Sequence, residues 1–368
     1  MHFKNENMQR VKFKSQDGDL FYKTLRKRVN QYFKENGIKR TGNWAMYLKT
    51  VVLFAAFFTP YFCFYFLPEQ PIYIYLLQWA LIGLATAGIG FSVMHDAVHG
   101  SYSIKQKLNN NLGHFSMLFI GGTVANWKIQ HNELHHTFTN VDGLDDDIKP
   151  PVPFLRFSPF SPKSAVHKFQ HIYAWFFYGM LSLVWTTTSE FKQILKYKNS
   201  GFYDNKTKEY QGVWSWIVFS RLFYWTMFLV LPVIFTSYSF WMILPGFLIM
   251  HFIIGVTISS VFQSAHVSPD TTFRTSEKGE DIPFSWAEHQ LFTTQNFAMK
   301  NRILSWYVGG LNFQIEHHLF PNICHIHYKN LAPIVQELSK KFDLPYITKP
   351  TFRSVLLDHG KMLYHLGH

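Results

Sequence analysis

Three short clusters of histidine have the residue type and spacing to bind metal ions. They are His95-x3-His99, His131-x3-His135-His136 and His317-His318. Residues four apart share one face of an α-helix, so His131 and His135 are expected to point at one metal, with His136 about 100° round the helix. Neutral imidazole is the commonest protein ligand for mid-row transition metals. The sequence therefore predicts a histidine-rich metal site.

Each cluster lies beside a long apolar stretch, which bears on the alternative that these are ordinary structural histidines. A single cluster is explained equally well by hydrogen-bonded core or surface residues. Buried imidazoles without partners are costly, so three clusters gathered in this way are not explained by packing. The acidic run 142–147 lacks the spacing of a calcium-binding EF-hand loop, and we expect it to be a solvated loop near the catalytic face.

Four apolar stretches are long enough to cross about 30 Å of hydrocarbon. They cover residues 46–67, 72–94, 213–235 and 240–261. The basic N-terminal end stays in the cytoplasm by the positive-inside rule, and the turns after the first and third stretches carry no Lys or Arg. The sequence thus predicts an all-α integral membrane protein with four transmembrane helices, both termini in the cytoplasm and a cytoplasmic histidine-rich helical cap.

Two further apolar stretches are not expected to span. Residues 115–124 are too short and predict a re-entrant or interfacial helix after a polar segment at 101–111. Residues 171–191 have lysines on both flanks, and a fifth crossing would put the third histidine cluster on the wrong side of the membrane. This stretch therefore predicts an interfacial helix.

The spans divide the chain into a basic N-terminal segment (1–45), a membrane domain (46–330) and a C-terminal segment (331–368). An apolar stripe within 20–33 is expected to form a helix on the membrane surface, and 332–342 an amphipathic helix. The net charge of +12 with no nucleic-acid motif favours an anionic membrane surface or substrate head group over nucleic acid. The two cysteines imply no disulfide framework, and we expect no cleavable signal.

The order of the clusters, with Gln314 opening the third, resembles that of the membrane fatty acid desaturases. The glutamine is similar to that of the front-end branch, which inserts a cis double bond between an existing one and the carboxyl end. The resemblance implies two iron ions, with O2 as co-substrate. It implies ligand roles for His95, His99, His131, His135, His136, His266, His317 and His318.

Four polar residues near the clusters are expected to act without binding iron directly. Asp96, Glu133 and Glu316 are candidates to orient imidazoles from behind, although each could equally be a surface carboxylate. Gln314 stands where many relatives carry histidine, and a carboxamide is a weak, neutral oxygen donor. We expect Gln314 to act at most through a water or an outer hydrogen bond.

The resemblance also implies the partners. The substrate is a long-chain fatty acyl-CoA or acyl-lipid, and the aromatic spans can build a narrow apolar tunnel for it. No His-Pro-Gly-Gly haem motif occurs in the sequence, so we expect electrons from a separate cytochrome b5 or ferredoxin. A bacterial cytoplasmic membrane is favoured over the endoplasmic reticulum.

Three alternative functions are compatible with parts of the sequence. A fatty acyl hydroxylase would use the same scaffold. A membrane zinc protease would use His95-Asp96-x-x-His99, which is close to the His-Glu-x-x-His pattern, but it would leave the other clusters unused, and zinc cannot oxidise an unactivated methylene. A metal transporter would carry its histidines within the spans, whereas these lie at span ends.

Overall fold

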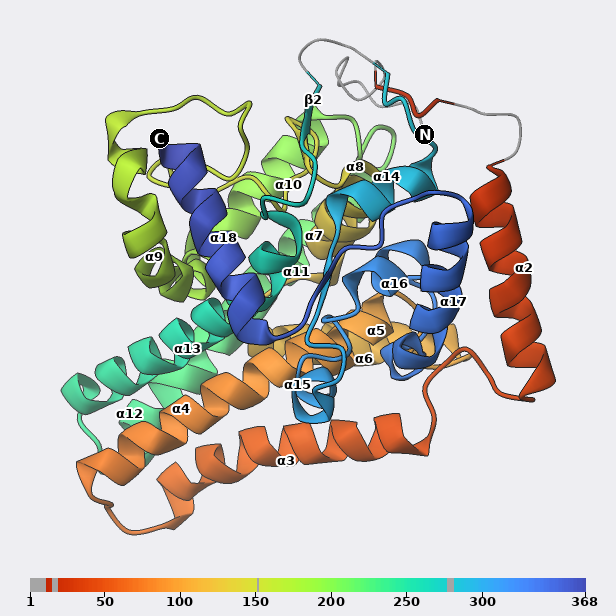
Figure 1. The fold of residues 1–368 in the computed structure, drawn as a ribbon. Coiled ribbons are helices and arrows are strands. Elements are labelled where there is room, and N and C mark those ends of the chain that lie inside the picture. The colour runs from red at the N-terminus through yellow and green to blue at the C-terminus, as the bar shows by residue number, and fades with distance from the viewer. Residues whose placement is uncertain (1–10, 15–18, 151, 277–280) are drawn as a thin grey trace.

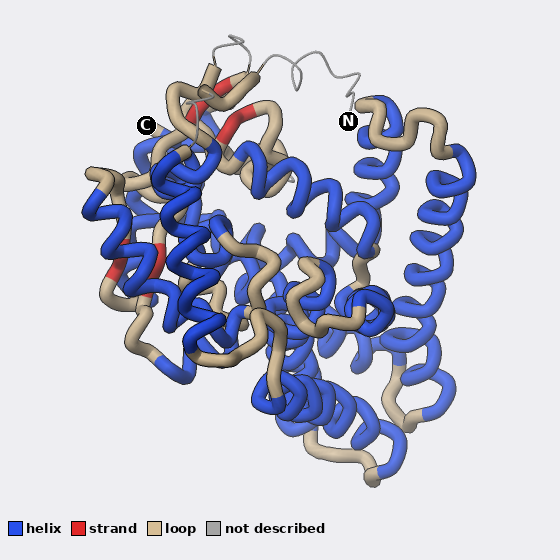
Figure 2. The backbone as a smooth tube through the Cα atoms, turned by 90° about the vertical axis from the view of Figure 1, so that its right-hand side faces the viewer, coloured by secondary structure: helices blue, strands red, loops and turns tan. Residues whose placement is uncertain are grey.

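The computed structural model describes residues 11–14, 19–150, 152–276 and 281–368, and these are mostly helical (Figures 1 and 2). The α-helices are α2 (Leu20–Glu35), α3 (Trp44–Phe66), α4 (Ile72–Ile89), α5 (His95–Val98), α6 (Gln106–Ile120), α7 (Val124–Trp127), α8 (His136–Phe138), α9 (Gln170–Val184), α10 (Glu190–Asn199), α11 (Thr207–Trp225), α12 (Leu231–Phe235), α13 (Phe240–His266), α14 (Trp286–Thr293), α15 (Arg302–Tyr307), α16 (Gln314–Leu319), α17 (Tyr328–Lys341) and α18 (Phe352–Gly367).

Shorter elements join or interrupt these helices. The π-helical turns are η1 (Gly90–Met94), η2 (Lys128–His135), η4 (Trp185–Ser189) and η5 (Thr226–Val230), and the 3-10 turns are η3 (Ala165–Phe169) and η6 (His325–His327). Strand β1 (Val141–Asp142) pairs in parallel with β2 (Arg274–Thr275), and β3 (Asn296–Phe297) pairs in parallel with β4 (Thr348–Lys349). These two-residue ladders tie loops together and do not form a core sheet.

Among the described residues, four helices are long and apolar enough to cross a membrane, which confirms the predicted number of spans. They cover Trp44–Phe66, Ile72–Val98, Thr207–Phe235 and Phe240–His266, within a turn or two of the predicted bounds. A helix satisfies its own backbone hydrogen bonds, as lipid requires. Figure 1 shows the turn between α3 and α4 at one end of this bundle and the short helices α5, α8 and α16 towards the other.

Helix α13 is central to the bundle and packs closely against α4 and α9. Gly246 lies against the fully buried Trp79 of α4, and a Cβ atom at this glycine would come within 2.1 Å of Trp79 Cδ1. Only glycine allows this approach. Helix α9 covers much of the predicted interfacial stretch and is not one of the four candidate spans.

Two local expectations differ from the structure. The apolar stripe of α2 does not lie on a membrane surface but is buried against α14 and α17, because Leu291 and Val335 supply apolar partners. Helix α6 begins at Gln106, so polar residues form its first turns. It ends at Gly121, whose φ of 78° suits a residue without a Cβ.

The last two helices of the chain pack against α2 and α16 and against the helices α9 and α13. Helix α17 contacts α2 and α16 and includes most of the predicted amphipathic helix at 332–342. Helix α18 packs against α9 and α13, so it reaches the membrane body. The division of the chain at residues 45 and 330 stays a prediction.

Candidate metal centre

The first histidine cluster lies where the second span ends. The span continues from α4 through the π-helical turn η1 into α5, so His95 begins α5 and His99 follows its last residue. The two imidazole rings lie 4.6 Å apart between centroids. The polar end of an otherwise apolar span therefore presents two nitrogens to the interior of the cap.

The second cluster lies in a π-helical turn, which changes the predicted geometry. Hydrogen bonds in such a turn join residues five apart. Accordingly, His136 Nε2 lies 3.2 Å from His131 Nε2. The sequence predicted that His131 would share a face with His135 and that His136 would lie about 100° away. His131 and His135 do lie together, with 5.2 Å between ring centroids, but the predicted displacement of His136 assumed an α-helix and is wrong.

The third cluster comes from the short helix α16, all of whose residues are buried. His318 lies beside His266, the last residue of α13, with 4.9 Å between ring centroids. His317 lies 4.5 Å from His95 by the same measure. The two histidines of α16 thus contact the C-terminal ends of both the second and the fourth span.

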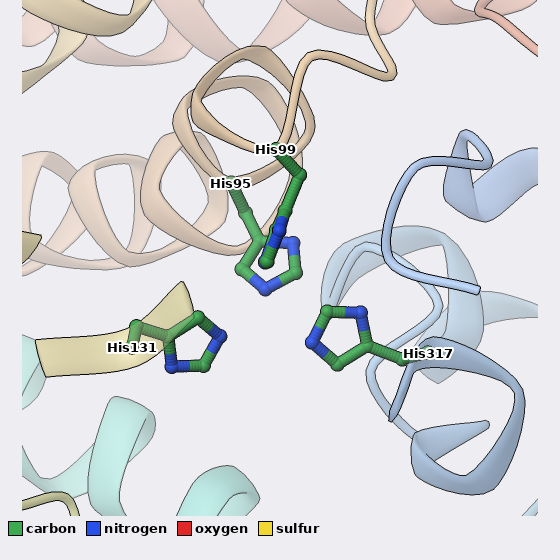
Figure 3. A group of neighbouring side chains, drawn as sticks. All are labelled: His95, His99, His131 and His317. Carbon is green, nitrogen blue, oxygen red and sulfur yellow. The ribbon is translucent and has the colours of Figure 1, made fainter. Parts of the chain in front are cut away.

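The eight predicted ligands converge as three overlapping groups. Ligand nitrogens lie within 4.8 Å of one another in His95, His99, His131 and His317, in His135, His266 and His318, and in His136, His317 and His318. Figure 3 shows the first group, with imidazoles from three separate segments facing a common space. Because the groups share His317 and His318, they form one continuous cluster of imidazoles.

Two carboxylates of the acidic loop accept hydrogen bonds from the Nδ1 atoms of two imidazoles of this centre. His131 Nδ1 donates to Asp147 Oδ2 at 2.9 Å, and His135 Nδ1 donates to Asp145 Oδ1 at 3.0 Å. Asp145 is buried and Asp147 nearly so. The acidic run 142–147 was expected to be a solvated loop, which is wrong for these two carboxylates. A carboxylate on Nδ1 fixes the tautomer and aims Nε2 at a metal.

Uncharged groups hold three further rings. His318 Nδ1 donates to Gln290 Oε1 at 2.8 Å, His266 Nδ1 donates to the Thr293 carbonyl at 3.3 Å, and His317 Nδ1 lies 3.3 Å from the Tyr328 hydroxyl. None of these three partners was predicted from the sequence. Only spatial proximity reveals them, because they lie 11 to 28 residues from the ring they hold.

The residues present fit a metal centre of this kind. The Nε2 atoms of His95, His99, His135, His266, His317 and His318 are buried and have no hydrogen-bond partner among the described residues. Burial lowers the pKa of His317 and His318 well below its ordinary value, and neighbouring imidazoles lower it further. Neutral rings with free, inward-facing nitrogens are what transition-metal binding requires.

Comparison with known proteins identifies the family. The sequence profile described as fatty acid desaturase matches residues 71–350. The sn-1 linoleoyl-lipid 6-desaturase of Synechocystis sp. is 32% identical over 361 residues, which are 98% of this chain and 98% of that protein. The chain belongs to the fatty acid desaturase family.

Other relatives cover much of the desaturase at similar identity. The sn-1 linoleoyl-lipid 6-desaturase of Arthrospira platensis is 33% identical over 91% of this chain and 89% of that protein. The acyl-lipid (8-3)-desaturase of Physcomitrium patens is 32% identical over 97% of this chain and 74% of that protein. The predicted resemblance to front-end-type desaturases and the assignment as an oxidoreductase are confirmed, and the protease and transporter alternatives are excluded.

The carboxylates proposed from the sequence as outer partners are placed elsewhere in the desaturase. Glu133 is half-buried, with Lys206 and Glu209 as its charged neighbours. Glu316 accepts hydrogen bonds from Asn296 Nδ2 and the Tyr346 hydroxyl, each at 2.8 Å. Neither forms a hydrogen bond with a ligand imidazole within the part of the chain that the structure describes. Asp145 and Asp147 make such hydrogen bonds instead.

Asp96 belongs to a second buried cluster beside the metal centre. Its Oδ2 accepts from the Cys324 thiol and from His325 Nδ1, both at 2.8 Å. Lys49 Nζ donates to His325 Nε2, also at 2.8 Å. These residues include three metal-binding types, but the lysine adds positive charge and uses the remaining imidazole nitrogen. The cluster is therefore a closed hydrogen-bond network.

Gln314 opens α16 with its side chain fully buried. Its amide oxygen and nitrogen have no hydrogen-bond partner among the described residues, and the amide is a neighbour of the His266 ring. This position agrees with a role at the edge of the metal centre.

Proposed function

We propose that the desaturase carries out O2-dependent insertion of a cis double bond into an acyl chain attached to a membrane lipid. The double bond would enter between an existing one and the carboxyl end. The observation that supports this most is the pair of cyanobacterial relatives, named as lipid 6-desaturases, which align with 91% or more of this chain. The converging histidines described above support a di-iron centre.

The residues of the chain have distinct tasks in this proposal. His95, His99, His131, His135, His136, His266, His317 and His318 would hold two irons. Such a pair supplies the oxidising power needed to remove hydrogen from two adjacent methylenes with O2. Asp145 and Asp147 keep two rings oriented, and the burial of the centre keeps bulk water away from it.

The test is expression in a host that makes no polyunsaturated fatty acids, with defined unsaturated fatty acids supplied. We expect a new cis double bond on the carboxyl side of the existing one, located by mass spectrometry. His318→Ala should abolish the product, whereas His365→Ala, which changes an exposed histidine of α18, should not. A hydroxylated product would instead indicate the hydroxylase alternative.

The form of the substrate needs a separate measurement. Purified enzyme in vesicles would be given the same acyl chain either esterified in a glycerolipid or as acyl-CoA, with dithionite as a reductant. We expect turnover of the glycerolipid. Turnover of acyl-CoA alone would contradict the lipid-linked part of the proposal and leave the desaturase reaction itself intact.

We also propose that the active site and both termini face the cytoplasm, in a bacterial cytoplasmic membrane. The basic N-terminal flank and the even number of candidate spans support this orientation. A cysteine at Lys196, in α10, should be labelled from the cytoplasmic side only. Labelling from outside intact cells would contradict the orientation.

A further inference from the structure

The outer face of α2 is strongly basic. Lys23, Arg26 and Lys27 are exposed, and among the described residues neither lysine has a carboxylate partner. The Arg26 guanidinium lies 5.7 Å from the centre of the Tyr22 ring. The single acidic residue within α2 is Glu35, at its C-terminal end. This face therefore favours an anionic partner.

The position of α2 indicates where that partner comes from. Figure 1 shows α2 at the right-hand edge, beyond the end of α3 that begins at Trp44 and on the far side from the α3–α4 turn. Its apolar stripe is buried, and the exposed side carries mainly charged and polar residues, with Leu20 at the first position of the helix as the exposed large apolar side chain. A protein in the aqueous phase fits this face better than lipid does.

A short route leads from this face to the metal-binding histidines. The Tyr22 hydroxyl donates to the Leu319 carbonyl at 3.1 Å, and Leu319 directly follows His318. The Tyr22 ring meets Trp286 edge-on, with 5.3 Å between centroids. Trp286 Nε1 then donates to the His136 carbonyl at 2.9 Å. Two aromatic rings thus connect the basic helix to the second and third histidine clusters.

The reaction creates a need for such a route. Desaturation consumes one –CH2–CH2– unit, one O2, two electrons and two protons, and it yields one –CH=CH– unit and two waters. Reduced one-electron carriers must supply both electrons, each carrier being oxidised once. The histidines are buried, so the electrons have to cross protein between the carrier and the metals.

We propose that the outer face of α2 is the docking surface for an acidic one-electron carrier protein, and that Tyr22 and Trp286 connect it to the metal centre. This inference rests on the proposed function. It assigns complementary tasks to the two faces of one helix. The charged face recruits the carrier, and Tyr22 contacts α16, which carries two of the predicted ligands, and Trp286 of α14.

The docking surface is tested by charge reversal. The variant Lys23→Glu/Lys27→Glu is compared with Lys168→Glu/Arg353→Glu, which changes the net charge equally at exposed residues on the α9–α18 side of the molecule. The probe is an acidic [2Fe–2S] ferredoxin in its oxidised form, binding to the protein in nanodiscs at low salt. We expect the ferredoxin to associate with the α2 variant about tenfold more slowly than with the parent protein, and this rate should depend less on salt. The control variant should show little change. Equal effects in both variants, or none in either, would overturn the docking surface.

The route is tested with Trp286→Leu and Tyr22→Leu, beside Tyr22→Phe as the conservative variant. The readout is the ratio of ferredoxin-driven to dithionite-driven iron reduction, because dithionite does not need to dock. We expect a lower ratio in both leucine variants, near-normal iron content and recovery with phenylalanine. An unchanged ratio would overturn the route. A parent enzyme that makes no product even with dithionite would refute the proposed function instead.

Discussion

Two buried clusters of the desaturase both contain histidine and aspartate and differ in what their imidazole nitrogens contact. In the metal centre, the Nδ1 atoms of His131 and His135 are held by carboxylates, while the Nε2 atoms of His135 and of five further rings have no partner among the described residues. In the second cluster, Asp96 and Lys49 occupy both nitrogens of His325. Histidine and aspartate together do not define a metal site. The neighbours define it by leaving at least one nitrogen free on seven of the eight rings.

The largest difference between the clusters should appear when a histidine is removed. His318→Ala or His135→Ala should abolish desaturation and lower iron content, while the protein still inserts into the membrane. His325→Ala should keep its iron but lose about 1–3 kcal/mol of stability, because Lys49 and Asp96 lose a buried partner. Iron per chain and thermal unfolding in detergent measure both effects. Near-normal turnover and iron in the first variants would refute the ligand assignment.

A smaller difference is expected for the carboxylates. Asp145→Asn removes the charge behind His135, which should weaken iron binding by about 10- to 100-fold. That charge matters because burial lowers the pKa of His135 but Asp145 and Asp147 raise it by more. Asp96→Asn should change iron affinity much less. Competition with a graded chelator gives both values, and equal losses would remove the distinction between the clusters.

The smallest effect on iron content is expected at Gln314, which shares the unpaired polar atoms of the metal centre but offers only a weak donor. Gln314→Ala should keep most of its iron and lose activity or regioselectivity, whereas Gln314→His should add a stronger ligand and alter the redox potential. Iron stoichiometry is measured beside product distribution for both variants. Loss of one iron per chain in the alanine variant would show that Gln314 binds the metal directly.

The sequence predicts the large features of the fold because they depend on long stretches of chain. The apolar runs specify four candidate spans, and the first histidine cluster and His266 fall at span ends, as expected. The second and third clusters lie outside the spans, on η2, α8 and α16. Helix α2 was predicted as a helix but placed wrongly. Its apolar stripe indicates that one face is covered, and cannot show whether lipid or α17 covers it.

The finer features of the site depend on contacts that have no local signal. The pairing of His131 with His136 follows from a π-helical turn, which the spacing of histidines alone does not reveal. Asp145 and Asp147 look like loop residues in the sequence, because nothing there shows that the loop folds back onto η2. Gln290 is likewise identified only by its contact with His318.

The last long helix has a consequence for how the enzyme is made. His359 of α18 donates from Nδ1 to the Val267 carbonyl at 2.8 Å, directly after the ligand His266, and its Nε2 lies 2.7 Å from the Tyr178 hydroxyl. A ribosome adds roughly 5–20 residues per second, so the first cluster emerges many seconds before α18 does. The metal centre cannot be complete while the helices that carry its later histidines are still being synthesised. If the proposed irons bind here, all eight histidines become available only after the third cluster in α16 has been made, and a cell starved of iron would insert the protein in an inactive form.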